Sequence, residues 1–167
     1  ALTDFSEHDN RRIKYFSGTA SYRKTIIIPP ELMTEDHKIV LDLGEMNDIA
    51  EVKVNGVRAG VLWYPPYTID ITDKLTAGEN RLEIAVTNNW ANRLIGDEQE
   101  TPDFEWGNDR GRQMGRAMLA YPDWFIHDEP RPSQGRRTFS IWYYYRNDSP
   151  LKPAGLTGPV RLCAESV

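Results

Sequence analysis

The chain has 167 residues, a formal net charge of −5 and a single cysteine, Cys163. This length suits one domain with a core of its own, one cysteine excludes an internal disulfide, and no apolar run is long enough to span a membrane. Acidic and basic residues are interspersed along the chain, whereas a nucleic-acid interface needs a coherent basic face. We therefore expect neither nucleic acid nor a membrane as a partner.

The first third of the chain predicts two strands. Residues 1–12 are mostly polar and form a lead-in segment. Residues 13–28 are predicted as a strand because they are rich in β-branched residues, and Pro29-Pro30 ends the run. A polar connection follows. Residues 39–43 are then predicted as a second strand, closed by Gly44.

The stretch from Ile49 to Asn88 carries the strongest strand signals. Apolar and polar residues alternate over 52–54 and again over 57–61, which predicts two strands with one face inward. Between them lies Asn55-Gly56, which accepts the positive φ angles of a type I′ turn. The sequence therefore predicts a tight antiparallel hairpin with its tip at these two residues.

The chain then turns a corner and returns. Pro65-Pro66 cannot donate to a ladder, so the preceding strand must stop there. Alternation resumes over 69–71 and, after a polar turn at 77–80, over 82–86. Short strands joined by turns predict an antiparallel sandwich.

After Val86 the pattern breaks for roughly 50 residues, which is unusually long for a loop in a compact domain. Beyond this insertion, 139–145 is predicted as an aromatic strand and 160–164 as the last strand. Loops on a rigid scaffold carry most functional sites, so we expect function to lie in the insertion, 89–138.

The insertion combines aromatic rings, carboxylates and guanidinium groups. Rings can stack on the apolar faces of a pyranose, and charged groups can bond its hydroxyls. The alternative is that the tryptophans form a satellite core, and the two stay open. The residues concerned are Trp90, Phe104, Trp106, Trp124, Phe125, Asp97, Glu98, Glu100, Asp103, Glu105, Arg93, Arg110, Arg112 and Arg116.

One short helix is predicted inside the insertion, over 108–121. Asn108-Asp109 would cap its start, Met114 and Met118 would share one face, and Pro122 would end it.

Other chemistry has little support. The histidines His8, His37 and His127 are far apart and lack metal-ligand spacing, so no metal site is expected. Cys163 next to Leu162 is predicted as a small buried hydrophobe rather than a nucleophile. No cofactor is expected, and no motif supports a structural calcium. We expect no catalytic residue in this chain.

Four stretches resemble the sugar-binding jelly-roll domain of family 2 glycoside hydrolases, a galactose-binding-domain-like sandwich. They read YRKTIIIP, AEVKVNGVRAG, YTIDITDKLTAGENRLEIAVTN and SPLKPAGLTGPVRL. The stretch WFIHDEPRPSQGRRTFSIWYYYRNDSPL is most similar to the C-terminal module of large bacterial family 106 α-L-rhamnosidases. The expected fold class is therefore all-β: an antiparallel jelly-roll β-sandwich, galactose-binding-domain-like, with a long irregular insertion.

In such enzymes a separate (β/α)₈ barrel performs hydrolysis. The resemblance implies that residues 1–167 are a non-catalytic accessory domain of a multidomain hydrolase. The first residue, Ala1 rather than Met, fits a processed protein or a segment of a longer one. It implies that the domain packs on the catalytic barrel of the same parent chain and helps to bind carbohydrate. It also implies a periplasmic or secreted location, although the chain shows no signal-peptide pattern.

The resemblance also suggests a site. In family 2 β-galactosidases, the segment after the GENRL strand sends an acidic residue into the active site; here Asp97, Glu98 and Glu100 are the alternatives. The candidate sugar-binding or active-site-edge residues are Trp90, Arg93, Asp97, Glu98, Trp106 and Trp124. The alternatives are an independent carbohydrate-binding module, a structural module whose aromatic loop is an interface, and a small self-contained glycosidase.

Overall fold

The computed structural model describes residues 2–108, 116–138 and 140–166. The chain divides into two compact units, which we call the sandwich unit and the insertion unit. The sandwich unit comprises Ala1–His8, Gly18–Asn89 and Pro153–Val167, and the insertion unit comprises Asp9–Ser17 and Trp90–Lys152. The expectation of one sandwich domain with an insertion over about 89–138 stays a prediction.

The larger sheet of the sandwich unit has four antiparallel strands in the order β1-β7-β4-β5. These strands are β1 (Thr19–Ile28), β7 (Gly78–Thr87), β4 (Ile49–Val54) and β5 (Val57–Leu62). Buried and more exposed residues alternate along β4 and over most of β7. The period of two seen in the sequence therefore places one face of this sheet inward.

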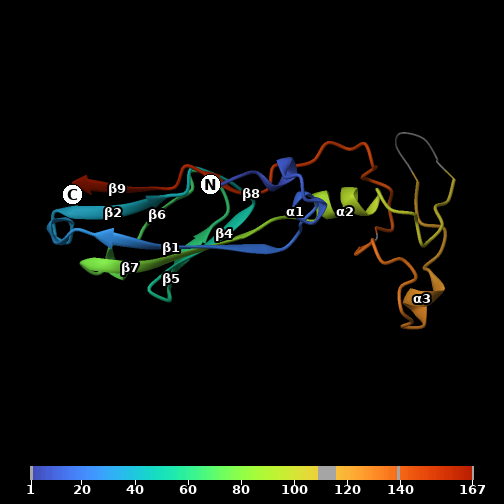
Figure 1. The fold of residues 1–167 in the computed structure, drawn as a ribbon, viewed down its shortest axis with the longest axis horizontal. Helices are drawn as coiled ribbons and strands as arrows, with labels where there is room; N and C mark the ends of the chain where they lie inside the picture. The colour runs from blue at the N-terminus through green and yellow to red at the C-terminus, as the bar shows by residue number, and fades with distance from the viewer. Residues whose placement is uncertain (1, 109–115, 139, 167) are drawn as a thin grey trace. The chain divides into compact units, whose positions relative to one another are not determined.

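A second sheet has the order β6-β2-β9 (Figure 1). A two-stranded ribbon pairs β3 with β8. Their bounds are β6 (Thr68–Asp70), β2 (His37–Asp42), β9 (Arg161–Ser166), β3 (Glu45–Asn47) and β8 (Gly155–Gly158). Single-turn 3₁₀ helices interrupt the connections at η1 (Phe5–Glu7), η2 (Pro30–Leu32) and η3 (Thr72–Lys74). The antiparallel sandwich predicted from the sequence is confirmed.

The core of the sandwich unit draws on both sheets. Leu41 of β2, Val52 of β4 and Ile84 of β7 belong to one buried cluster, and the first two are fully buried. Burying such an aliphatic side chain stabilises the fold by roughly 1.5–3 kcal/mol. The strands that alternate most regularly in the sequence therefore supply the core.

The β4–β5 hairpin turns where the sequence predicts. Asn55 has φ 53° and Gly56 has φ 80°, both in the left-handed region that a type I′ turn requires. The Asn55 side chain also accepts a hydrogen bond from the backbone N–H of Arg81 at 2.9 Å and donates to Asn80 Oδ1 at 2.8 Å. Asn55 thus both permits the turn and ties it to β7.

The insertion unit contains α1 (Arg11–Lys14), α2 (Ala91–Asp97) and α3 (Asp123–Ile126). Two isolated bridges, Trp106 with Met118 and Ala117 with Trp142, connect its irregular segments. At its neck the buried Asn92 side chain pairs with the backbone of Lys152, donating to its carbonyl at 2.7 Å and accepting from its N–H at 2.8 Å. An amide side chain thus joins the two ends of the long excursion.

Three local predictions were wrong. The strand expected over 13–28 begins only at Thr19, because Asn10 caps helix α1 by accepting a hydrogen bond from the N–H of Arg12 at 2.9 Å. The described residues 140–145 of the strand expected over 139–145 form no strand, and only Trp142 makes a bridge. Phe139 lies outside the described residues.

The third wrong prediction is the helix expected over 108–121. Residues 109–115, including Met114, lie outside the described residues, and 116–121 contain the two bridges rather than a helix. Pro122, expected to end a helix, instead occupies the N-cap position of α3. A proline fits the start of a helix because its fixed φ and missing N–H cost nothing there.

Candidate functional site

The site forms around α2 and the segment 9–17 of the same unit. Ala91 and Ile95 are four apart on α2 and both are buried, so this face anchors the helix. A Cβ atom at Gly96 would lie 2.6 Å from both Cβ and Cγ of Tyr15. Glycine at this position therefore lets the Tyr15 side chain lie directly against α2.

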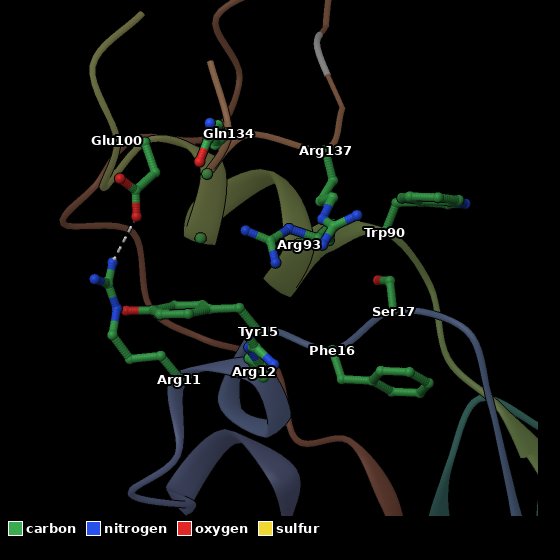
Figure 2. A pocket seen from close by; sticks show the side chains of 12 residues that line it. Arg11, Arg12, Tyr15, Phe16, Ser17, Trp90, Arg93, Glu100, Gln134 and Arg137 are labelled. Carbon is green, nitrogen blue, oxygen red and sulfur yellow. Dashed lines mark hydrogen bonds and ion pairs between the residues drawn. The ribbon is translucent and has the colours of Figure 1, made fainter. Parts of the chain in front are cut away.

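These segments enclose a cleft of about 630 Å³, which we call the arginine cleft (Figure 2). Its walls carry four guanidinium groups and one carboxylate. The lining residues are Arg11, Arg12, Tyr15, Phe16, Ser17, Trp90, Arg93, Gly96, Glu100, Gln134, Gly135 and Arg137. In Figure 2, Arg11 and Glu100 lie to the left, Arg93 lies near the centre, and Arg137 and Trp90 lie to its right.

Two of the four arginines are paired. Arg11 Nη2 lies 3.3 Å from Glu100 Oε1; the Arg11 side chain is exposed and that of Glu100 is partly buried. Arg93 Nη2 lies 2.6 Å from Asp97 Oδ1, and that pair is largely buried. Arg12 and Arg137 are exposed and have no ion pair among the described residues. The cleft therefore has a local excess of positive charge in a chain that is acidic as a whole.

Asp97 points inward, away from solvent. Only 1% of its surface is exposed. Its Oδ2 atom accepts hydrogen bonds from the N–H of Arg137 at 3.0 Å, the N–H of Thr138 at 2.6 Å and the Thr138 hydroxyl at 2.7 Å. This carboxylate holds residues 137 and 138 in place beside the cleft.

A second charged cluster lies in the same unit. Arg136 is buried and donates to Glu98 Oε1 and, at 3.1 Å, to the carbonyl of Glu100. Asp103 accepts hydrogen bonds from Arg131 and from the Ser133 hydroxyl. Burial raises the pKa of Asp103, but these bonds and the guanidinium charges outweigh burial, so its pKa lies below the ordinary value. The Asp103 carboxylate is therefore held in its ionised form, and Glu98 is paired with Arg136.

A family model described as "Glycosyl hydrolase 2 galactose-binding domain-like" matches residues 3–130, more than half of the chain. The chain belongs to this family. The resemblance drawn from the strand motifs is therefore confirmed, as is the galactose-binding-like fold.

Relatives show that this galactose-binding-like chain is similar to part of much larger proteins. A Formosa agariphila protein named "Putative beta-glucuronidase" is 43% identical over 161 residues, covering 96% of this chain but 13% of that protein. The structure of a rhamnosidase from Novosphingobium sp. PP1Y matches 98% of this chain and 12% of its own, with 35% identity and a TM-score of 0.73. The expected likeness to a rhamnosidase is confirmed.

A third comparison concerns the fold alone. A Bifidobacterium dentium β-glucuronidase, solved with coumarin-3-O-glucuronide, has a TM-score of 0.55 and 21% identity over 97% of this chain and 23% of its own. The galactose-binding-like fold thus recurs at low sequence identity. Within the described residues, no helix is both long and apolar enough to cross a membrane, and no group of three or more His, Cys, Asp or Glu could hold a metal ion.

The structure separates the six candidate site residues into three pairs. Trp90, which is 60% exposed, and Arg93 line the arginine cleft. Asp97 and Glu98 are each paired with an arginine.

The last pair packs within the unit. The Trp106 ring lies 4.9 Å from that of Phe104 and 4.8 Å from that of Tyr143. Trp124 donates to the carbonyl of Asp103 at 3.1 Å and lies under the Arg131 guanidinium. Trp106 and Trp124 thus make contacts within the unit, whereas Trp90 is largely exposed.

Sequence reasoning missed several lining residues of the cleft. Arg11, Arg12 and Tyr15 belong to the segment expected to be lead-in and strand, and Arg137 lies some 40 residues beyond α2. The sequence feature that could have indicated these residues is the pair of doubly basic dipeptides Arg11-Arg12 and Arg136-Arg137 in an acidic chain.

Proposed function

We propose that this chain is a non-catalytic accessory domain of a larger glycoside hydrolase, and that its insertion unit packs on the catalytic domain and helps to bind carbohydrate. The proposal is supported by family membership and by the share of each relative that this chain covers, 13% of the Formosa agariphila protein and 12% of the rhamnosidase. A periplasmic or secreted location is part of the same proposal and rests on the resemblance alone.

One observation carries the packing role: the insertion unit exposes many large apolar side chains. Exposed fractions are 66% for Leu119, 51% for Phe125, 59% for Ile141 and 73% for Tyr144. The segments that carry Leu119 and Ile141 are neighbours, since Met118 N–H donates to the carbonyl of Ile141 at 2.8 Å. A group of exposed apolar side chains of this kind marks an interaction surface. The proposed occupant is the remainder of the hydrolase chain.

The carboxylates support the non-catalytic assignment. A glycosidase needs two carboxyl groups that face the scissile bond, one of them able to protonate the leaving group. Asp97 is buried under three hydrogen bonds, and Glu98 is bound by Arg136. Neither is available to a substrate as an acid or a base, so we expect the isolated chain to release no sugar from glycosides.

A pull-down with the remainder of the parent hydrolase, supplied as a separate chain, tests the packing role. We expect association that is weakened at least tenfold by Phe125→Ser combined with Tyr144→Ser. Ile27→Ser is the matched control, because Ile27 is 67% exposed but lies in the sandwich unit. Unchanged association of the double variant would contradict the proposed surface.

A second candidate, an independent carbohydrate-binding module, is favoured by the arginine cleft with its exposed Trp90. Sugar binding by the isolated chain would support it.

A further inference from the structure

The arginine cleft has more cationic groups than its own carboxylates neutralise. Arg11, Arg12, Arg93 and Arg137 line it, and the carboxylates paired with them are Glu100 and Asp97. Two guanidinium charges therefore remain without an ion pair among the described residues. Unpaired cationic groups that line a concave surface raise the local positive potential, and that potential attracts an anion.

The type of cation indicates the type of anion. A guanidinium group is planar and presents paired N–H donors, which match the two oxygens of a carboxylate or a sulfate. Both unpaired arginines, Arg12 and Arg137, are exposed. Their backbone N–H groups are bonded to Asn10 and Asp97, so the local backbone is held without help from either guanidinium group. The guanidinium groups are therefore free to turn toward a ligand.

The remaining lining indicates that the anion is carried by a sugar. Trp90 is 60% exposed at the cleft, and a flat ring of this kind stacks on the apolar face of a pyranose. Gln134 is also exposed and offers an amide that can both donate to and accept from hydroxyl groups. Figure 2 shows the Trp90 ring on the same side of the cleft as Arg137. One ligand could therefore contact a ring and a guanidinium together.

We propose that the arginine cleft binds an anionic saccharide, with Arg137 and Arg12 bonding a carboxylate or sulfate group and Trp90 stacking on the sugar ring that bears it. This inference rests on the proposed function only in taking carbohydrate as the ligand, and it does not require the domain to dock. The docking test and the test below can therefore fail independently.

The experiment is titration calorimetry on the isolated 167-residue chain with three matched ligands: an oligouronate, its methyl ester and a sulfated oligosaccharide. The methyl ester keeps the ring and linkage and removes the charge. We expect the oligouronate or the sulfated oligosaccharide to bind at least tenfold more tightly than the ester. The tighter of the two acids identifies whether the cleft prefers a carboxylate or a sulfate.

Variants locate the binding. Arg137→Gln and Trp90→Ala should each weaken binding of the preferred acid at least tenfold. Arg161→Gln is the control, because Arg161 is an exposed arginine on β9 of the sandwich unit. Raising the salt concentration should weaken binding of the acid more than binding of the ester.

Three outcomes would overturn the proposal: equal binding of the oligouronate, the sulfated oligosaccharide and the ester, no detectable binding of either acid, or binding that Arg137→Gln leaves unchanged. Circular dichroism of each variant shows whether the fold is retained, and Arg12→Gln gives a second test should Arg137→Gln fail to fold.

Discussion

Asp97→Ala should destabilise the insertion unit strongly, because this buried carboxylate joins α2 to residues 137 and 138. The change removes three hydrogen bonds to Oδ2 and leaves Arg93, whose side chain is only 18% exposed, without its partner. Breaking a buried ion pair by removing one partner costs about 3–5 kcal/mol. For a chain of this size that corresponds to a fall in Tm of about 6–20 °C.

Tryptophan fluorescence in a urea titration is the suitable assay. Of the five tryptophans, all but Trp63 lie in the insertion unit, so the emission reports mainly on that unit. Glu105→Ala is the matched control, since Glu105 is an exposed carboxylate of the same unit and should change stability by no more than about 0.5 kcal/mol. Asp97→Asn should cost less than Asp97→Ala, because its amide oxygen can still accept from Thr138. A loss below about 1 kcal/mol for Asp97→Ala would refute the structural role.

Three further predictions follow from the geometry. Gly96→Ala should lower the free energy of unfolding by about 1–3 kcal/mol in the same urea titration, because the added methyl group would lie 2.6 Å from Tyr15. The pKa of Asp103 is lowered from 3.8 in the folded chain, so ionised Asp103 stabilises the fold fully above its unfolded pKa, and this stabilisation is lost as pH falls through the folded pKa. In Asp103→Asn, the free energy of unfolding should therefore fall less steeply with pH below about pH 4. Asn55→Ala should lower the free energy of unfolding by about 2 kcal/mol in far-UV circular dichroism melts, because alanine disfavours the positive φ at this position and cannot accept the bond from Arg81. Asn55→Gly should lower it less, because glycine tolerates a positive φ.

The sandwich was predictable because its signals are local. Asn55-Gly56 specifies a turn within two residues, and the alternation around Val52 specifies which face is buried. The strand predictions were wrong where another interaction competed with strand pairing. Asn10 caps a helix that interrupts the expected first strand, and the aromatic residue Tyr143 packs on Trp106 instead of pairing in a sheet.

The site was less predictable because its parts are far apart in the sequence. Trp90 and Arg93 were found as an aromatic and a basic residue at the start of the insertion. The role of Asp97 depends on Thr138, which is 41 residues away, and Arg12 comes from a segment with no feature that sets it beside α2. No local pattern carries that information.

The Asn92 pairing has a consequence for how this unit can change in evolution. Its side chain imitates a peptide group and joins residue 92 to residue 152 at the point where the excursion leaves and returns. Once the neck is closed, doubling the intervening chain adds only about 0.6 kcal/mol of closure entropy. Changes of length in the exposed connections between these two residues are therefore inexpensive as long as Asn92 and the buried pairs of Asp97 and Arg136 remain. Related chains should accordingly differ in length at these connections while Asn92 is retained.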